Sequence, residues 1–186
     1  MTISRPEAEQ SLAAIQAAHQ ESRHRSAYRR AAPYIFGWGI VWALGYLGMT
    51  VLPIGTANIV WLVLICAMIG FSAVVMRRQS ASKLSWGRIA LYLVVPTVAL
   101  IIVVNLIVNG FSIHNRTDIS ALFVFVVAAG YAISGLKYGR WYGQLGLGIA
   151  LITALGLWLL PPGWKFDIFY LDAACLLLAG FWFRRA

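Results

Sequence analysis

Long apolar runs alternate with short polar segments along most of this chain. Six of these runs approach the length of about 20 residues that a helix needs to cross roughly 30 Å of hydrocarbon. They carry no Lys or Arg in their interiors and lie near 32–52, 58–76, 89–109, 119–136, 141–160 and 166–183. The period-two alternation of a membrane β-barrel strand is absent, and a helix satisfies its own backbone polar groups in lipid. The pattern therefore predicts an all-α, polytopic integral membrane protein built as a bundle of six transmembrane helices.

Composition supports this interpretation and excludes several other classes. Apolar residues make up 61% of the 186 positions and charged residues 11%, whereas soluble domains average about 45–50% and about 25%. Two cysteines are too few for a disulfide scaffold. Six spans and an N-terminal segment leave connections too short to hold a further domain. Any chemistry is therefore expected between the helices or at their ends.

The distribution of positive charge predicts the orientation. The chain carries 15 Lys and Arg residues, and Arg116 and Lys165 are the two that fall in outer loops if the N-terminus is inside. Such a bias follows the positive-inside rule and favours cytoplasmic N- and C-termini. We expect the protein in a cell membrane, most simply a bacterial inner membrane, with the lipid bilayer as a partner. The net charge of +9 then needs no nucleic acid to explain it.

The first 30 residues are predicted to form a cytoplasmic N-terminal helix and a basic juxtamembrane segment, followed by the transmembrane domain at 31–186. Ser4 and Glu7 have the spacing of a capping box, and the helix is expected from Pro6 to about Arg25. Its larger apolar residues, Leu12 and Ile15, are three apart and form a narrow stripe. The stripe is interpreted as a docking surface for a protein partner or a second copy, or alternatively as part of a solvated leader.

Polar residues gather on the outer side of the predicted bundle. Asp172 lies inside the sixth span among Phe, Tyr and Leu, where an uncompensated carboxylate is costly, so we expect it to face the bundle and find a partner. Three interpretations stay open: a ligand-binding or proton-coupled site, an ion-paired lid that ties helices together, and a carboxylate at headgroup level that caps a short helix. Thr117 and Asp118 are expected to cap the fourth span, and Asp167 the sixth. The members of the cluster are Asp172, Arg116, His114, Asn105, Asn109 and Lys165, with Tyr170 as a further possible partner of Asp172.

Other features bear on packing within the bundle. Gly135, Gly139 and Gly143 recur every four residues, which favours close helix packing within the chain or between copies. Pro96 is expected to kink the third span. Cys66 and Cys175 lie near the middle of two spans, and a disulfide between them stays open.

Motifs for catalysis, metal binding or a cofactor are lacking. His19 and His24 precede the first span, which excludes a haem held between two histidines in the bundle, and His114 has no second histidine outside. No phosphate-binding loop is present. We therefore expect a non-enzymatic protein without metal or cofactor that acts as an interaction, accessory or regulatory subunit. The alternative is a small transporter or channel with an outward-facing polar site around Asp172.

Overall fold

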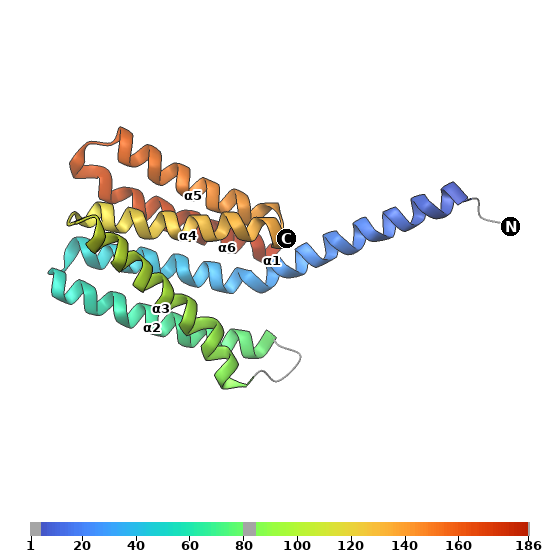
Figure 1. Ribbon diagram of the computed structural model, residues 1–186, viewed down its shortest axis with the longest axis horizontal. Helices are drawn as coiled ribbons and strands as arrows, with labels where there is room; N and C mark the ends of the chain where they lie inside the picture. Colours follow the sequence, from blue (N-terminus) through green and yellow to red (C-terminus); the bar gives the residue numbers. More distant parts are fainter. Residues whose placement is uncertain (1–4, 80–84, 186) are drawn as a thin grey trace.

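The computed structural model describes residues 5–79 and 85–185, which are helical apart from short connections (Figure 1). The expected all-helical fold is confirmed, and within these residues six helices are long and apolar enough to cross a membrane. The elements are α1 (Arg5–Val51), α2 (Ile54–Gln79), α3 (Trp86–Gly110), α4 (Arg116–Tyr138), α5 (Arg140–Leu159), a 3-10 turn η1 (Pro162–Asp167) and α6 (Ile168–Arg185).

The N-terminal helix and the first span, predicted as two segments, are one uninterrupted helix. Between Arg25 and Ala32 no Gly or Pro interrupts the helix, and α1 continues through Pro33. Its 47 residues correspond to about 70 Å at 1.5 Å per residue, roughly twice the thickness of the hydrocarbon layer. The first half of α1 consequently projects far beyond the bundle (Figure 1). We call residues 9–27 the arm.

The start of α4 differs from the predicted cap, while the predicted Asp167 directly precedes α6. The N-cap of α4 is Asn115, whose side chain accepts a hydrogen bond from the backbone N–H of Thr117 at 3.1 Å. The expectation that Thr117 or Asp118 caps this helix is therefore wrong, and Asp118 lies in the first turn, where its charge favours the helix dipole. Before α6, the expected cap residue Asp167 is the last residue of the 3-10 turn. The predicted capping box at the start of α1 includes Ser4, which lies outside the described residues.

Helices α1, α4, α5 and α6 pack closely through glycines. A Cβ on Gly180 of α6 would lie 2.7 Å from the backbone nitrogen of Phe36 in α1. In the same way Gly135 of α4 faces Gly143 of α5, and Gly146 lies against the backbone of Ala128. Hydrogen in place of a side chain lets these backbones approach, which stabilises helix pairs in lipid. The glycine pattern at the α4–α5 junction thus serves packing within the chain.

The α2–α3 hairpin packs more openly. Its glycines at 55, 70, 87 and 110 have nothing within 4 Å of an added Cβ. Among the described side chains of α3, Ile89 and Val104 are buried, while Val95, Ile102 and Leu106 and other apolar residues are exposed. The helix continues through Pro96. In Figure 1, α3 crosses obliquely over the neighbouring helices rather than running parallel to them.

Both cysteines are free. Cys66 of α2 is exposed and Cys175 of α6 is partly buried. The disulfide that the sequence left open is not formed in this structure.

Candidate functional site

Asp172 is the buried acidic residue of the described bundle. It lies one turn into α6 with 0% of its surface exposed. Thr153 of α5 donates a hydrogen bond from Oγ1 to Asp172 Oδ2 at 2.8 Å, and the same hydroxyl lies 3.0 Å from the carbonyl oxygen of Ile149. The other carboxylate oxygen, Oδ1, is buried and has no hydrogen-bond partner within the described residues. A buried carboxylate with an unsatisfied oxygen is costly, and in a membrane helix such a group points to function.

The partners expected for Asp172 lie elsewhere. His114 Nδ1 is hydrogen-bonded to the carbonyl of Ser112 in its own loop, and the hydroxyl of Tyr170 pairs with Thr50 Oγ1 at 2.7 Å. Arg116 is exposed at the start of α4, Lys165 is partly buried in η1, and within the described residues neither forms an ion pair with Asp172.

The two asparagines of the predicted cluster bond to their own helix. Asn105 donates from its side chain to the carbonyl of Ile101, and Asn109 donates to that of Asn105, both at 2.8 Å. Both side chains are exposed on α3. The structure thus does not assemble these amides with Asp172.

Thr153 is the partner that sequence reasoning missed. The available signal was weak: Thr153 is a polar residue in the apolar fifth span, and it lies within two turns of the connection to α6. Asp172 lies within two turns of the same connection on the other side. Because α5 and α6 are antiparallel neighbours, the two residues reach the same level of the bundle.

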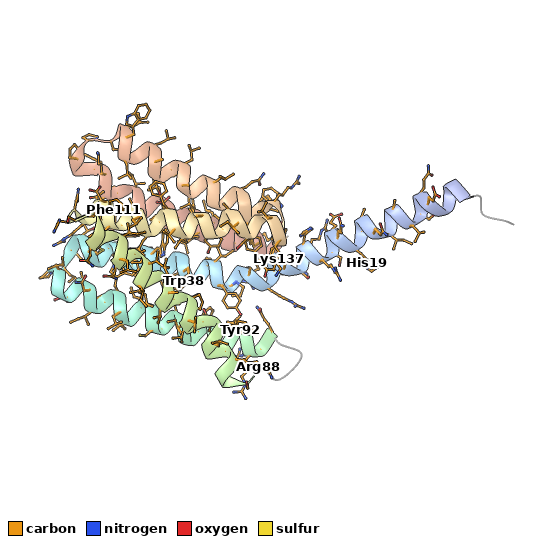
Figure 2. The ribbon with its side chains drawn as sticks, in the orientation of Figure 1. His19, Trp38, Arg88, Tyr92, Phe111 and Lys137 are labelled. Atoms are coloured by element: carbon orange, nitrogen blue, oxygen red, sulfur yellow. The ribbon has the colours of Figure 1, made fainter. Side chains whose placement is uncertain are left out.

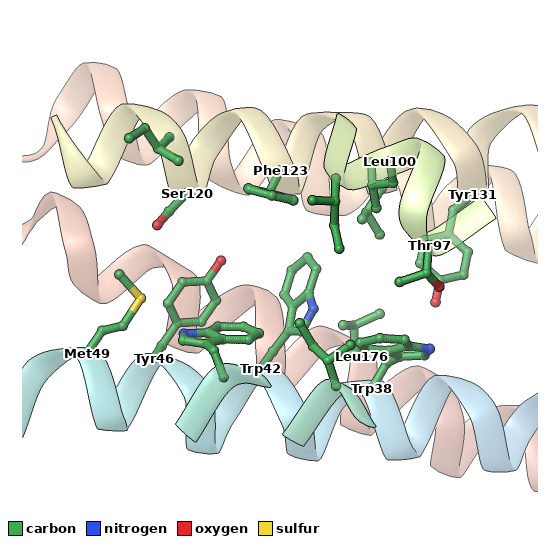
Figure 3. Close-up of a pocket in the computed structure, with 15 residues that line it drawn as sticks. Trp38, Trp42, Tyr46, Met49, Thr97, Leu100, Ser120, Phe123, Tyr131 and Leu176 are labelled. Carbon is green, nitrogen blue, oxygen red and sulfur yellow. The ribbon is translucent and has the colours of Figure 1, made fainter. Parts of the chain in front are cut away.

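A cavity of about 460 Å³ lies between the α2–α3 hairpin and helices α1 and α4, within the size range of small-molecule pockets. Its walls are aromatic and aliphatic, and the hydroxyls of Tyr46 and Ser120 face each other across it (Figure 3). The ring of Tyr46 also stacks on Phe169 of α6 at 4.8 Å between centroids. Trp61 lines the cavity, and its buried Nε1 has no hydrogen-bond partner in the described part of the chain. The main lining residues are Trp38, Trp42, Tyr46, Trp61, Thr97, Ser120, Phe123 and Tyr131.

The base of the arm is fixed to the bundle. Tyr28 is buried against Phe183 of α6 and Tyr142 of α5, with ring centroids 4.9 and 5.5 Å away. One turn earlier, His24 Nδ1 lies 3.0 Å from the carbonyl oxygen of Tyr138. Gly139, at φ +115°, lets the α4–α5 turn approach Tyr28, because a side chain there would overlap the Tyr28 hydroxyl. This anchorage of His24 and Tyr28 was not predicted.

Beyond its base the arm is solvent-exposed. Leu12 and Ile15 are 58% and 54% exposed, and at this spacing they share one face of the helix. Figure 2 shows the side chains of the arm standing away from the bundle, with His19 labelled on it.

Basic residues gather at the end of the bundle from which the arm projects. The last turns of α2, α4 and α6 carry Arg77 and Arg78, Lys137, and Arg184 and Arg185. Arg140 begins α5 and Arg88 lies in the first turn of α3. Because neighbouring helices run in opposite directions, these ends meet on one face of the molecule.

The fold and these sites define an all-helical bundle whose six described helices have the length and composition to cross a membrane. No protein-family model, curated protein or solved structure matches this chain. Among the described residues, no group of three or more His, Cys, Asp or Glu side chains comes together as a metal site would require.

Proposed function

We propose that the protein is a small, non-enzymatic, multi-pass subunit of a cell membrane that acts through protein interaction, with six spans and both termini in the cytoplasm. The observation that carries the proposal is the single helix α1, which joins the projecting arm to the helical bundle without a break. The clustering of basic residues at the arm's end of the bundle supports the orientation.

The arm has the properties of a docking element. Short isolated helices are marginal in water, so an exposed helix gains stability when a partner covers its apolar residues. Leu12 and Ile15 offer such a contact. Since His24 and Tyr28 attach the arm to the bundle, a partner bound on the arm is held at a fixed direction from the membrane.

The test compares two faces of the arm in the full-length protein. L12Q/I15Q removes the apolar contact, and A13Q/A14Q places the same side chains on the opposite face of the helix. After chemical crosslinking in native membranes, we expect the wild type and A13Q/A14Q to purify with the same partner or as the same homo-oligomer. L12Q/I15Q is expected to lose that partner while keeping its thermal stability. Retention of the partner by L12Q/I15Q would overturn the docking role.

A second function, a small transporter or channel, is supported by the buried Asp172 with its partnerless Oδ1. Ionisable residues inside membrane bundles mark ion and proton pathways. In proteoliposomes, D172N should abolish proton or monovalent-cation flux without loss of the fold. D167N alters an exposed carboxylate in the adjoining turn and serves as the matched control. Equal flux in wild type and D172N, or no flux in either, would dismiss this function.

A further inference from the structure

Two adjoining hollows lie where the arm leaves the bundle. The larger, about 960 Å³, lies between the arm, the α4–α5 turn and the end of α6. The smaller, about 670 Å³, lies on the side of α1 that carries Ser26 and Arg29. Arg25, Arg185 and Glu21 line both hollows. We call the two together the arm groove.

The arm groove is strongly basic. Arg25, Arg29, Arg140 and Arg185 line it, and Glu21 is its one acidic residue among the described residues. Glu21 is paired with Arg25 at 2.7 Å, so the other three guanidinium groups have no carboxylate partner in the described structure. Guanidinium groups bind phosphate oxygens through paired, charge-assisted hydrogen bonds. The groove therefore has the charge of a site for a phosphate-bearing ligand.

Aromatic residues place the groove at the level of lipid headgroups. Trp141 and Trp182 lie side by side on α5 and α6, with ring centroids 6.1 Å apart, and Trp182 is 57% exposed. The guanidinium of Arg140 lies 5.4 Å from the ring centre of Trp141, and that of Arg185 lies 4.2 Å from the ring centre of Phe181. Tryptophan is enriched where hydrocarbon gives way to headgroups. The arginines and these rings thus line one hollow, and exposed residues such as Leu147 and Leu178 continue the apolar surface along α5 and α6.

We propose that the arm groove binds an anionic phospholipid, such as phosphatidylglycerol, with its phosphate between Arg185 and Arg140 and its acyl chains along α5 and α6. Arg25, which is paired with Glu21, lines the same hollow from the arm, so the bound lipid lies between the arm and the bundle. The proposal rests on membrane insertion as proposed above but is independent of the arm's docking role.

The experiment measures lipid binding to the full-length protein in a neutral detergent. Native mass spectrometry counts bound lipids, and thermal unfolding reports their effect on stability. The probes are phosphatidylglycerol, phosphatidylcholine with the same acyl chains, and inorganic phosphate. The variant R140Q/R185Q is compared with R78Q/R88Q, which removes two exposed charges from the same end of the bundle, outside the groove.

We expect retained phosphatidylglycerol and a higher unfolding temperature for the wild type and R78Q/R88Q. Affinity should fall about tenfold or more in R140Q/R185Q, as the loss of charge-assisted hydrogen bonds implies. Phosphatidylcholine should give neither effect. If R140Q/R185Q does not fold, R185K serves in its place, because lysine keeps the charge but loses the paired geometry of the guanidinium. R185K should weaken phosphatidylglycerol binding without preventing folding.

Three results would overturn the proposal. Equal losses of phosphatidylglycerol affinity in R140Q/R185Q and R78Q/R88Q would mean that the lipid binds to diffuse surface charge rather than to a site. The same stabilisation by inorganic phosphate would identify a free phosphate, not a lipid, as the ligand. Unchanged phosphatidylglycerol binding in both R140Q/R185Q and R185K would exclude the arm groove as the binding site. Failure of membrane insertion is distinguished from all three, because the protein would then stay soluble without detergent.

Discussion

The four helices α1, α4, α5 and α6 differ from the α2–α3 hairpin in how closely their backbones approach. In the first group, glycines such as Gly146 and Gly180 lie directly against neighbouring backbone atoms. In the hairpin, Gly70 and Gly87 face open space. Helix α2 instead meets α1 through large side chains, as where the Trp61 ring lies over Gly45.

The two candidate sites lie in regions that differ in this packing. Lipid gives no hydrophobic drive for helix association, so close backbone approach sets the strength of packing. The buried pair of Asp172 and Thr153 lies inside the closely packed group. The cavity lies at the boundary, where the hairpin meets α1 and α4. The polar pair therefore lies where the helices pack closely, and the cavity lies where the hairpin packs less closely.

The largest effect is expected from filling a glycine contact in the closely packed group. In G146A the new methyl group would overlap backbone atoms of Ala128 and Ala132, which cannot give way as a flexible side chain can. Overpacking of this kind lowers the free energy of unfolding by about 1–3 kcal/mol. Reversible unfolding in mixed micelles measures this change. The matched control G70A meets open space and should be neutral or gain up to about 1 kcal/mol of helix propensity. Equal destabilisation by the two changes would remove the distinction between the regions.

The next largest effect is expected from removing the hydrogen bond between Thr153 and Asp172. T153V keeps the shape of the side chain but removes the hydrogen bond to Asp172, leaving a buried carboxylate without a partner in the described structure. We expect a loss of about 1–2 kcal/mol of unfolding free energy, less than for G146A. In the D172N background the same change should cost less, because a neutral amide loses less than a carboxylate. Additive effects in this double-mutant cycle would show that the two residues do not interact.

How much the sequence could predict depends on the kind of feature. Hydrophobic length located all six helices, because each apolar run is long enough to form one helix of the length that a span requires. It could not show that the N-terminal helix and the first span are continuous, since hydropathy marks where lipid begins and not where a helix ends. It also could not pair Asp172 with Thr153, because that contact depends on the rotation of α5 against α6. The cavity is lined by residues from several helices, so it depends on how these helices are arranged in space.

The smallest effect concerns the cavity at the boundary. W61F removes a buried N–H that has no partner among the described residues and leaves most of the ring in place. Stability should change by no more than about 1 kcal/mol, because the unpaired N–H is no longer buried while the smaller ring loses part of its packing against Gly45 and Tyr46. The control W158F alters a ring that is 80% exposed and should have no effect. A loss well above about 1 kcal/mol by W61F alone would contradict this balance between ring packing and the unpaired N–H.

Side-specific labelling of single cysteines tests the central claim, that six helices cross the membrane and place the arm and the outer loops on opposite faces. The background is C66A/C175A, and the probes are Q10C on the arm, N115C before α4 and G163C before α6. In sealed right-side-out vesicles, a membrane-impermeant maleimide should label N115C and G163C at once and Q10C after permeabilisation. Labelling of Q10C together with either loop in sealed vesicles would contradict the account.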